Sequence, residues 1–516
     1  MSDTPVQAPT KDLKGRAVRG STIILGAQAF QMVLQVASVM ILARLLAPAD
    51  FGIVAMVAPV QALAVLIKTI GLGDAVIQRQ DLKTSQLNAL FWIQLAVCAG
   101  LSLTMALLAP AVAWFYDREV LVAITIAYSS VILLGGLGSM HENLLTRRMA
   151  FKKVAFVQLT AAVLGFATGI VAAMILQNYW ALVLMVIARA AIETVLFWAL
   201  ARWLPGRPRS AEKIGELLRF GGSVAGAKMA HYVANNSTTI LLGKVLGEVS
   251  LGLYDRANRL LVYPTAQLHK PLQNVGIPLL SRLQDDDQRY RKAFVTILQG
   301  LAVIAAPGLV SFVVFSDEVV LLAFGEGWSA VAPIFALLAP VTLSQLINHP
   351  LAWLFFTQGR PGEMVAWAWT RSLLLLAAVI AGLPYGLIGV VAAYAGTQLL
   401  IVTPAIWIWS TRIGPVRLKD ALRAILPYLA GIPPTLLVLE IMHRRLDLGA
   451  AAELALAILA AYAIMGLISL AFPQGRSGLK DLIALRHQLA KKRGGRRVEA
   501  TPAEEPSSAA VVAKGA

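Results

Sequence analysis

Long apolar segments dominate this sequence and limit what it can fold into. Fourteen runs of mostly apolar residues follow one another from residue 21 to residue 472, separated by short polar segments. A helix of about 20 such residues spans the hydrocarbon core of a bilayer. Hydrophobic residues make up 58% of the chain and charged residues only 14%, whereas soluble domains carry about 25% charged residues. The sequence therefore predicts an all-α polytopic membrane protein with about 14 transmembrane helices.

The predicted spans leave no room for a folded domain outside the membrane. The first run is too long for a signal-peptide core and is expected to be retained as a span. The single cysteine, Cys98, excludes an intrachain disulfide. The approximate limits are 21–46, 52–77, 86–113, 119–140, 154–177, 180–203, 217–245, 250–280, 292–316, 329–357, 364–383, 386–411, 421–442 and 451–472.

The distribution of lysine and arginine predicts the orientation. If the N-terminus is cytoplasmic, 33 of the 45 basic residues fall in cytoplasmic segments and five on the opposite side. Short cytoplasmic loops carry such an excess, so both termini are predicted to be cytoplasmic. The net charge of +17 is thus topological and does not indicate nucleic-acid binding, although the basic tail is expected to contact lipid headgroups.

An internal repeat divides the chain. "ILARLLAPADFGI" (41–53) aligns with "LLGKVLGEVSLGL" (241–253) at a shift of 200 residues, and both halves begin from the same side of the membrane. Parallel repeats of this kind occur in transporter folds. The predicted organisation is a cytoplasmic N-terminus (1–20), an N-lobe of six helices (21–205), a C-lobe of six helices (214–411), two extra helices (421–472) and a basic, disordered cytoplasmic tail (473–516).

Seven basic residues remain inside the predicted spans, where a charge is costly and usually faces the bundle interior or a water-filled cavity. They are Lys68, Arg189, Lys228, Arg256, Arg259, Lys270 and Arg371.

At 100° per residue, three spans carry polar residues in narrow stripes. These stripes predict one wet cavity between the two halves. Their members are Gln28, Gln31 and Gln35; Lys228, His231, Asn235 and Thr239; and Arg256, Arg259, Tyr263 and Lys270.

Each of these residues also has a structural interpretation, which the sequence leaves open. Asp255 can neutralise Arg256 or Arg259 in an ion pair. Arg189 and Glu193 lie one helical turn apart and are expected to pair. Three others can be explained by the membrane interface or by packing: Lys68, Lys270 and His231.

The surplus of positive charge predicts an anionic ligand. The spans contain few acids, and arginine binds phosphate through paired hydrogen bonds. We therefore expect a phosphate, a pyrophosphate or an acidic sugar rather than a cationic drug. The sequence shows no nucleophile constellation, metal-ligand cluster or phosphate-binding glycine loop, so neither an enzyme nor a metal or other cofactor is predicted.

Four segments carry a resemblance to the oligosaccharide flippase family of polysaccharide export, in the same order and spacing: "GLGDAVIQRQDL" (71–82), "LNALFWIQL" (87–95), "LLTRRMAFKKVAFVQL" (144–159) and "LGLYDRANRLLVYP…IPLLSRLQDD" (251–286). This family shares a superfamily with multidrug and toxin extruders. The resemblance implies a two-lobe fold like that of the extruders. It also implies flipping of undecaprenyl-pyrophosphate-linked oligosaccharide across a bacterial inner membrane for exopolysaccharide, capsule or O-antigen synthesis.

The chain departs from its relatives in residues 235–243, "NNSTTILLG". Relatives often have arginine where Asn235 stands and aspartate where Thr238 stands. A carboxylate that could carry a coupling cation is therefore missing. If a proton or sodium gradient drives transport, the remaining candidates for carrying the cation are Asp74, Asp255 and His231.

The expected substrate-binding residues are Arg256, Arg259, Lys228, Arg371, Lys270, Lys68, Arg189, Asn235, Gln28 and Gln31. Two other functions stay open: a multidrug exporter of the same fold, and a membrane polysaccharide polymerase. The absence of a sizeable non-cytoplasmic loop disfavours the polymerase. The resemblance also implies interaction with the polymerase and chain-length regulator of the same pathway.

Overall fold

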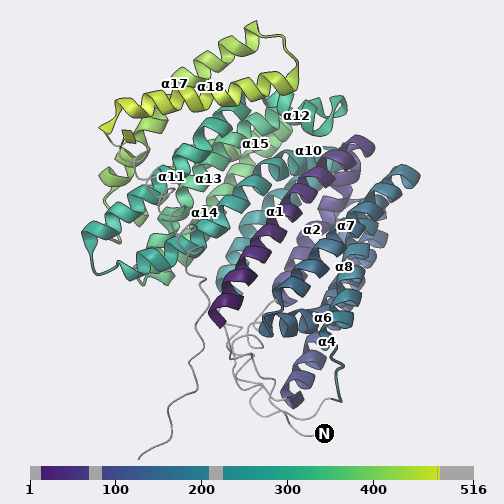
Figure 1. The fold of residues 1–516 in the computed structure, drawn as a ribbon. Coiled ribbons are helices and arrows are strands. Elements are labelled where there is room, and N and C mark those ends of the chain that lie inside the picture. The colour runs from purple at the N-terminus through teal and green to yellow at the C-terminus, as the bar shows by residue number, and fades with distance from the viewer. Residues whose placement is uncertain (1–12, 69–83, 208–224, 474, 477–516) are drawn as a thin grey trace, which may run out of the picture.

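The structure is a computed structural model, and it describes residues 13–68, 84–207, 225–473 and 475–476. Within these ranges the chain forms helices joined by short turns, and no strand occurs (Figure 1). The predicted tail, 473–516, lies almost wholly outside the described residues. The α-helices are α1 (Leu13–Leu45), α2 (Pro48–Lys68), α4 (Thr84–Leu107), α5 (Ala109–Tyr116), α6 (Val120–Arg147), α7 (Phe151–Leu176), α8 (Trp180–Ala201), α10 (Ala225–Arg282), α11 (Asp287–Val314), α12 (Ser316–Phe324), α13 (Ala332–Thr357), α14 (Pro361–Gly382), α15 (Gly386–Thr397), α16 (Thr403–Ser410), α17 (Leu418–Arg445) and α18 (Ala450–Ala471).

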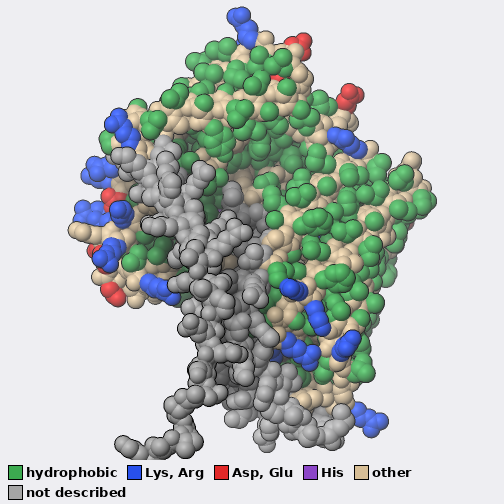
Figure 2. All heavy atoms as spheres, viewed as in Figure 1, with side chains coloured by type: hydrophobic (Ala, Val, Ile, Leu, Met, Phe, Trp, Pro, Cys, Tyr) green, Lys and Arg blue, Asp and Glu red, His purple; other side chains and the backbone are tan. Residues whose placement is uncertain are grey.

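Eleven stretches of the described residues are long and apolar enough to cross a membrane. One of them, Pro361–Ser410, covers two predicted spans, and α10 covers two more that are not among the eleven. The all-α polytopic fold is confirmed, whereas the number of fourteen spans stays a prediction. Figure 2 shows apolar side chains over the outer surface of the helices, as expected for a multi-pass membrane protein.

Several helix limits differ from those expected. The predicted span 86–113 is wrong as one helix, because α4 ends at Leu107 and α5 begins at Ala109, with a proline in its first turn. The predicted span 119–140 is too short, since α6 continues to Arg147. Within α10, Gly247 has φ 78° and ψ −177°, a conformation essentially restricted to glycine, and it divides α10 into two helices.

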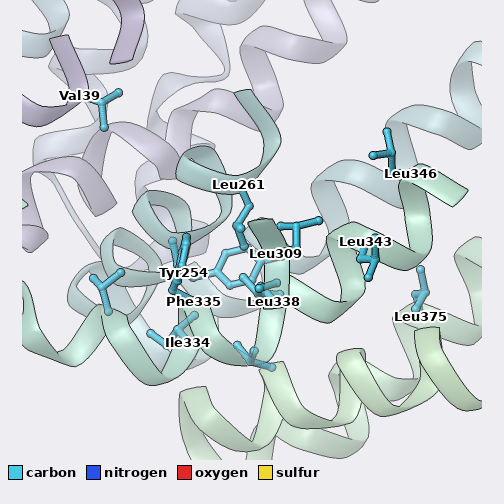
Figure 3. Close-up of a cluster of buried hydrophobic side chains, with 14 of the residues drawn as sticks. Val39, Tyr254, Leu261, Leu309, Ile334, Phe335, Leu338, Leu343, Leu346 and Leu375 are labelled. Atoms are coloured by element: carbon cyan, nitrogen blue, oxygen red, sulfur yellow. The ribbon is translucent and has the colours of Figure 1, made fainter. Parts of the chain in front are cut away.

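The helices form two groups with α10 between them (Figure 1). Helices α1, α2 and α4 to α8 lie on one side, and α11 to α16 on the other, while α17 and α18 pack against α11. Tyr254 and Leu261 of α10 point into a buried apolar cluster with Leu309 of α11 and Phe335 of α13 (Figure 3). The second half of α10 is therefore anchored in the C-lobe by its apolar face.

The two segments of the sequence repeat contact each other reciprocally. A Cβ added at Gly52 would overlap the backbone of Glu248, and one added at Gly252 would overlap the backbone of Pro48. Residues 48 and 52 are related to residues 248 and 252 by the shift of 200 residues found in the sequence. Only residues without a side chain allow α2 and α10 to cross at this distance.

Candidate functional site

Three charged residues form a cluster on the second half of α10. The carboxylate of Asp255 accepts from Arg256 Nη2 at 2.5 Å and from Arg259 Nε at 2.8 Å. Arg259 Nη1 also donates to the hydroxyl of Tyr263 at 2.6 Å. One aspartate thus serves two arginines, and the cluster keeps a surplus charge of about +1.

The two arginines have different environments. The Arg256 side chain is only 9% exposed, and its guanidinium stacks over the ring of Phe51 in α2, 4.3 Å from the centroid. The Arg259 side chain, about one turn further along α10, is 39% exposed. Both point away from the apolar face that anchors α10. Arg256 is thus fixed by packing, whereas Arg259 remains accessible to a ligand.

A cavity of about 620 Å³ opens beside this cluster. Its walls come from α1, α2, α6, α7, α8 and α10, so it lies between the N-lobe and the charged face of α10. The α10 wall consists of Asp255, Arg256, Arg259 and Tyr263. Much of the remaining lining is apolar, which strengthens the electrostatic attraction between a bound anion and Arg259.

The N-lobe part of the wall carries a second charged pair and two amides. Arg189 Nε lies 3.0 Å from Glu193 Oε1 on α8, and this pair confirms the expected contact one turn apart. Gln31 and Gln35 of α1 also line the cavity. The Gln31 Nε2 atom is buried and has no hydrogen-bond partner among the described residues, so it can donate to a ligand oxygen.

The remaining predicted residues do not gather at this cavity. Lys68, Arg371 and Gln28 are described, but none of them lines it. Arg371 on α14 is half-buried and forms no ion pair with the described residues. The structure thus unites only part of the predicted set. Predicted residues whose side chains lie outside the described part are Lys228, His231, Asn235, Lys270 and Asp74.

The sequence interpretation missed Glu142. The predicted span ends at residue 140 and so leaves Glu142 out, but Glu142 lies within α6 and accepts from Gln158 Nε2 of α7 at 3.1 Å. It interacts electrostatically with Lys68 and Glu193. The continuing apolar periodicity through Leu144 and Leu145 was the signal that could have extended the helix. The N-lobe therefore contains a mixed acid–base group next to the cavity.

Several polar contacts between the two lobes lie near the C-terminal end of α1. Figure 1 shows this end of α1 on the opposite side of the molecule from its start. Glu248 of α10 accepts from Arg118 at 3.0 and 3.1 Å, and Lys244 lies 2.7 Å from Asp117. Trp328 also donates to the carbonyl of Ala43 in α1 at 2.7 Å. These ion pairs and this hydrogen bond hold the two lobes together near the C-terminal end of α1.

Comparison with known proteins agrees with this architecture. The chain is 25% identical over 349 residues to the teichuronic acid biosynthesis protein TuaB of Bacillus subtilis (strain 168), covering 67% of this chain and 69% of that protein. It is also 25% identical over 387 residues to the lipopolysaccharide biosynthesis protein WzxC of Escherichia coli (strain K12), covering 74% and 76%.

Two solved structures have a similar fold. The lipid II flippase MurJ in an inward closed conformation aligns with a TM-score of 0.66 at 15% identity, over 89% of this chain and 100% of that one. An inward-facing multidrug resistance MATE family transporter of the MOP superfamily aligns with a TM-score of 0.56 at 16% identity, over 74% and 94%. Both likenesses support the predicted two-lobe fold.

The family assignment comes from the sequence. Residues 41–333 match the family described as "Polysaccharide biosynthesis protein", and this match covers more than half of the chain. It includes α10 and most of the cavity. The protein therefore belongs to the polysaccharide biosynthesis protein family.

Proposed function

We propose that this protein is a flippase for a polyprenyl-pyrophosphate-linked oligosaccharide, the repeat unit of a bacterial surface polysaccharide. The observation that carries the proposal is Arg259, an accessible cation on the wall of a cavity between two lobes. A pyrophosphate offers oxygens that a guanidinium can bind through paired hydrogen bonds. Family membership and relatives named for teichuronic acid and lipopolysaccharide biosynthesis support this class of substrate.

In the proposed mechanism, the headgroup enters the cavity while the polyprenyl chain remains in the lipid. Arg259 binds the pyrophosphate, and Gln31 and Gln35 donate to the sugar or to phosphate oxygens. Arg256 holds the α10 wall against Phe51 rather than touching substrate. Rocking of the lobes, with opening of the pairs Arg118–Glu248 and Lys244–Asp117, then exposes the headgroup on the other side.

We place the protein in the bacterial inner membrane with both termini in the cytoplasm, because that topology puts 33 of 45 basic residues in cytoplasmic segments. The end of the molecule where Arg118–Glu248 and Lys244–Asp117 join the lobes then faces the periplasm, and the substrate enters from the cytoplasm. The protein acts without covalent chemistry of its own. If a proton or sodium gradient drives the cycle, Asp255 is a poor carrier, since both arginines already bind it.

A direct test uses proteoliposomes that contain a polyprenyl-pyrophosphate oligosaccharide with a labelled terminal sugar. An impermeant glycosidase added outside then measures how much headgroup reaches the outer leaflet. We expect wild-type protein to expose the inner pool, and Arg259→Ala to slow exposure at least tenfold. Equal rates with and without protein would contradict the proposal, and protection against cationic drugs in a susceptibility panel would favour a drug exporter.

A further inference from the structure

A second cluster of side chains lies far from the cavity, where the α17–α18 hairpin meets α12. It consists of Glu318 in the first turn of α12, His443 in the last turn of α17 and Glu453 in the first turn of α18. One ligand atom from each residue lies within 4.8 Å of the others. Because more than 100 residues separate Glu318 from the other two, no local sequence motif reveals the cluster.

Two buried polar atoms in this cluster lack hydrogen bonds. Glu318 Oε2 and His443 Nδ1 are buried and have no hydrogen-bond partner among the described residues. His443 Nδ1 faces the other carboxylate oxygen of Glu318 at 3.3 Å. Glu318 Oε2 therefore has no partner among the described residues, and His443 Nδ1 has only this contact, which does not meet hydrogen-bond geometry. A buried polar atom without a hydrogen bond destabilises the folded state.

The surroundings favour a cation as the partner of these atoms. A cavity of about 460 Å³ adjoins the cluster, and its lining from the described part of the chain contains no lysine or arginine but five carboxylates: Asp317, Glu318, Glu326, Asp447 and Glu453. Two arginines near these helix ends are already engaged, since Arg44 donates to Leu322 O and Arg444 pairs with Glu440, while Arg445 is exposed.

The packing also holds the ligands in place. The His443 ring packs edge-on against Phe315, with centroids 5.1 Å apart. Glu453 is only 8% exposed, and its Oε1 accepts from the backbone amide of Leu448 at 3.0 Å. The backbone amide of Leu448 therefore satisfies one oxygen of Glu453, but Glu318 Oε2 is left without a partner among the described residues.

We propose that Glu318, His443 and Glu453 bind a divalent metal cation that fastens the α17–α18 hairpin to the C-lobe. One imidazole and two carboxylates form a ligand set that suits Zn²⁺, with a further position left for water. Ligands about 2.1 Å from Zn²⁺ in a tetrahedral site lie about 3.4 Å apart. The three atoms lie within 4.8 Å of one another, so binding requires them to approach slightly.

The test measures Zn²⁺ binding to the full-length protein, purified without a histidine tag and stripped with chelator. We expect one tightly bound Zn²⁺ per chain by equilibrium dialysis, and a thermal midpoint that rises by several degrees when Zn²⁺ is added. His443→Gln and Glu318→Gln should weaken binding at least tenfold. The matched control Glu440→Gln removes a carboxylate from the same helix outside the cluster, and it should bind like wild type.

A second readout does not depend on the stability of the variants. Co²⁺ bound through His443 should give visible absorption bands that disappear in His443→Gln but persist in Glu440→Gln. The proposal is overturned if the wild-type protein binds no Zn²⁺ or if all variants bind it equally. It is also overturned if Mg²⁺ binds as tightly as Zn²⁺ and His443→Gln changes nothing, since the acidic cavity would then be only a diffuse counterion site.

Discussion

Two charged groups line the cavity, one on α10 and one on α8, and they are built differently. On α10, Asp255 is shared by two arginines and the group keeps a positive surplus, whereas on α8 Arg189 and Glu193 neutralise each other. The α8 pair is also the more exposed, since the side chains of Arg189 and Glu193 are 49% and 30% accessible. This contrast indicates that α10 supplies the net attraction for an anion, while α8 supplies a polar surface that does not trap it.

The largest expected effect comes from removing the shared acid. Asp255→Asn leaves two cations next to each other, one of them almost fully buried, and should destabilise the fold by about 3–5 kcal/mol. Thermal unfolding and the yield of folded protein measure this loss. The double variant Asp255→Asn/Arg256→Met should recover part of the yield, and unchanged stability of the single variant would show that the cluster is more hydrated than its geometry indicates.

The next largest effect should distinguish the contribution of Arg259 on α10 to flipping from that of Arg189 on α8. Arg259→Ala keeps the Asp255–Arg256 pair and should lower flipping by about 10- to 100-fold with a normal protein level, because a hydrogen bond to a charged group is worth about 1.5–3 kcal/mol. Arg189→Ala should lower flipping only two- to threefold. The proteoliposome assay measures both variants, and equal losses would mean that the walls share the headgroup.

A smaller effect is expected from giving α8 a surplus charge. Glu193→Gln releases Arg189 from its partner and should tighten retention of the lipid-linked substrate about two- to fivefold, as for a pair worth up to about 1 kcal/mol. The fraction of protein purified with bound lipid-linked sugar reports this change. Weaker retention would indicate that Glu193 itself binds the sugar.

The smallest effect belongs to an ion pair outside the cavity. Asp117 is 76% exposed and pairs with Lys244, so Asp117→Asn should cost less than about 1 kcal/mol. Thermal unfolding of Asp117→Asn and Asp255→Asn, measured in parallel, compares the loss of an exposed paired aspartate with the loss of a buried one. Asp117→Asn is thus the matched control. If Asp117→Asn lost as much stability as Asp255→Asn, burial of the aspartate would not explain the large effect expected for Asp255→Asn.

The sequence predicted those features that depend on spacing within one helix. The polar stripe through Arg256, Arg259 and Tyr263 follows from 100° per residue, and so does the pair of Arg189 with Glu193. The sequence did not show that Arg256 is buried while Arg259 is accessible. The burial of Arg256 depends on its contact with Phe51, which lies about 200 residues away in the sequence.

Features that depend on the rotation or the length of a helix were less predictable. Arg371 was grouped with the cavity because of its charge and depth, yet α14 does not contribute to the lining. Glu142 was missed because the end of an apolar span cannot be located accurately from the sequence. The cluster of Glu318, His443 and Glu453 was missed because its residues come from three helices. Such contacts are fixed by tertiary packing and not by local periodicity.

The central claim is that Arg259 recognises a lipid-linked pyrophosphate in the cavity. Native mass spectrometry of gently purified wild-type protein and Arg259→Ala tests it most directly. We expect the wild-type protein to carry a polyprenyl-pyrophosphate oligosaccharide, whose mass identifies the repeat unit, and the variant to have lost it. Wild-type protein that holds only ordinary phospholipid, in the same amount as the variant, would contradict the claim.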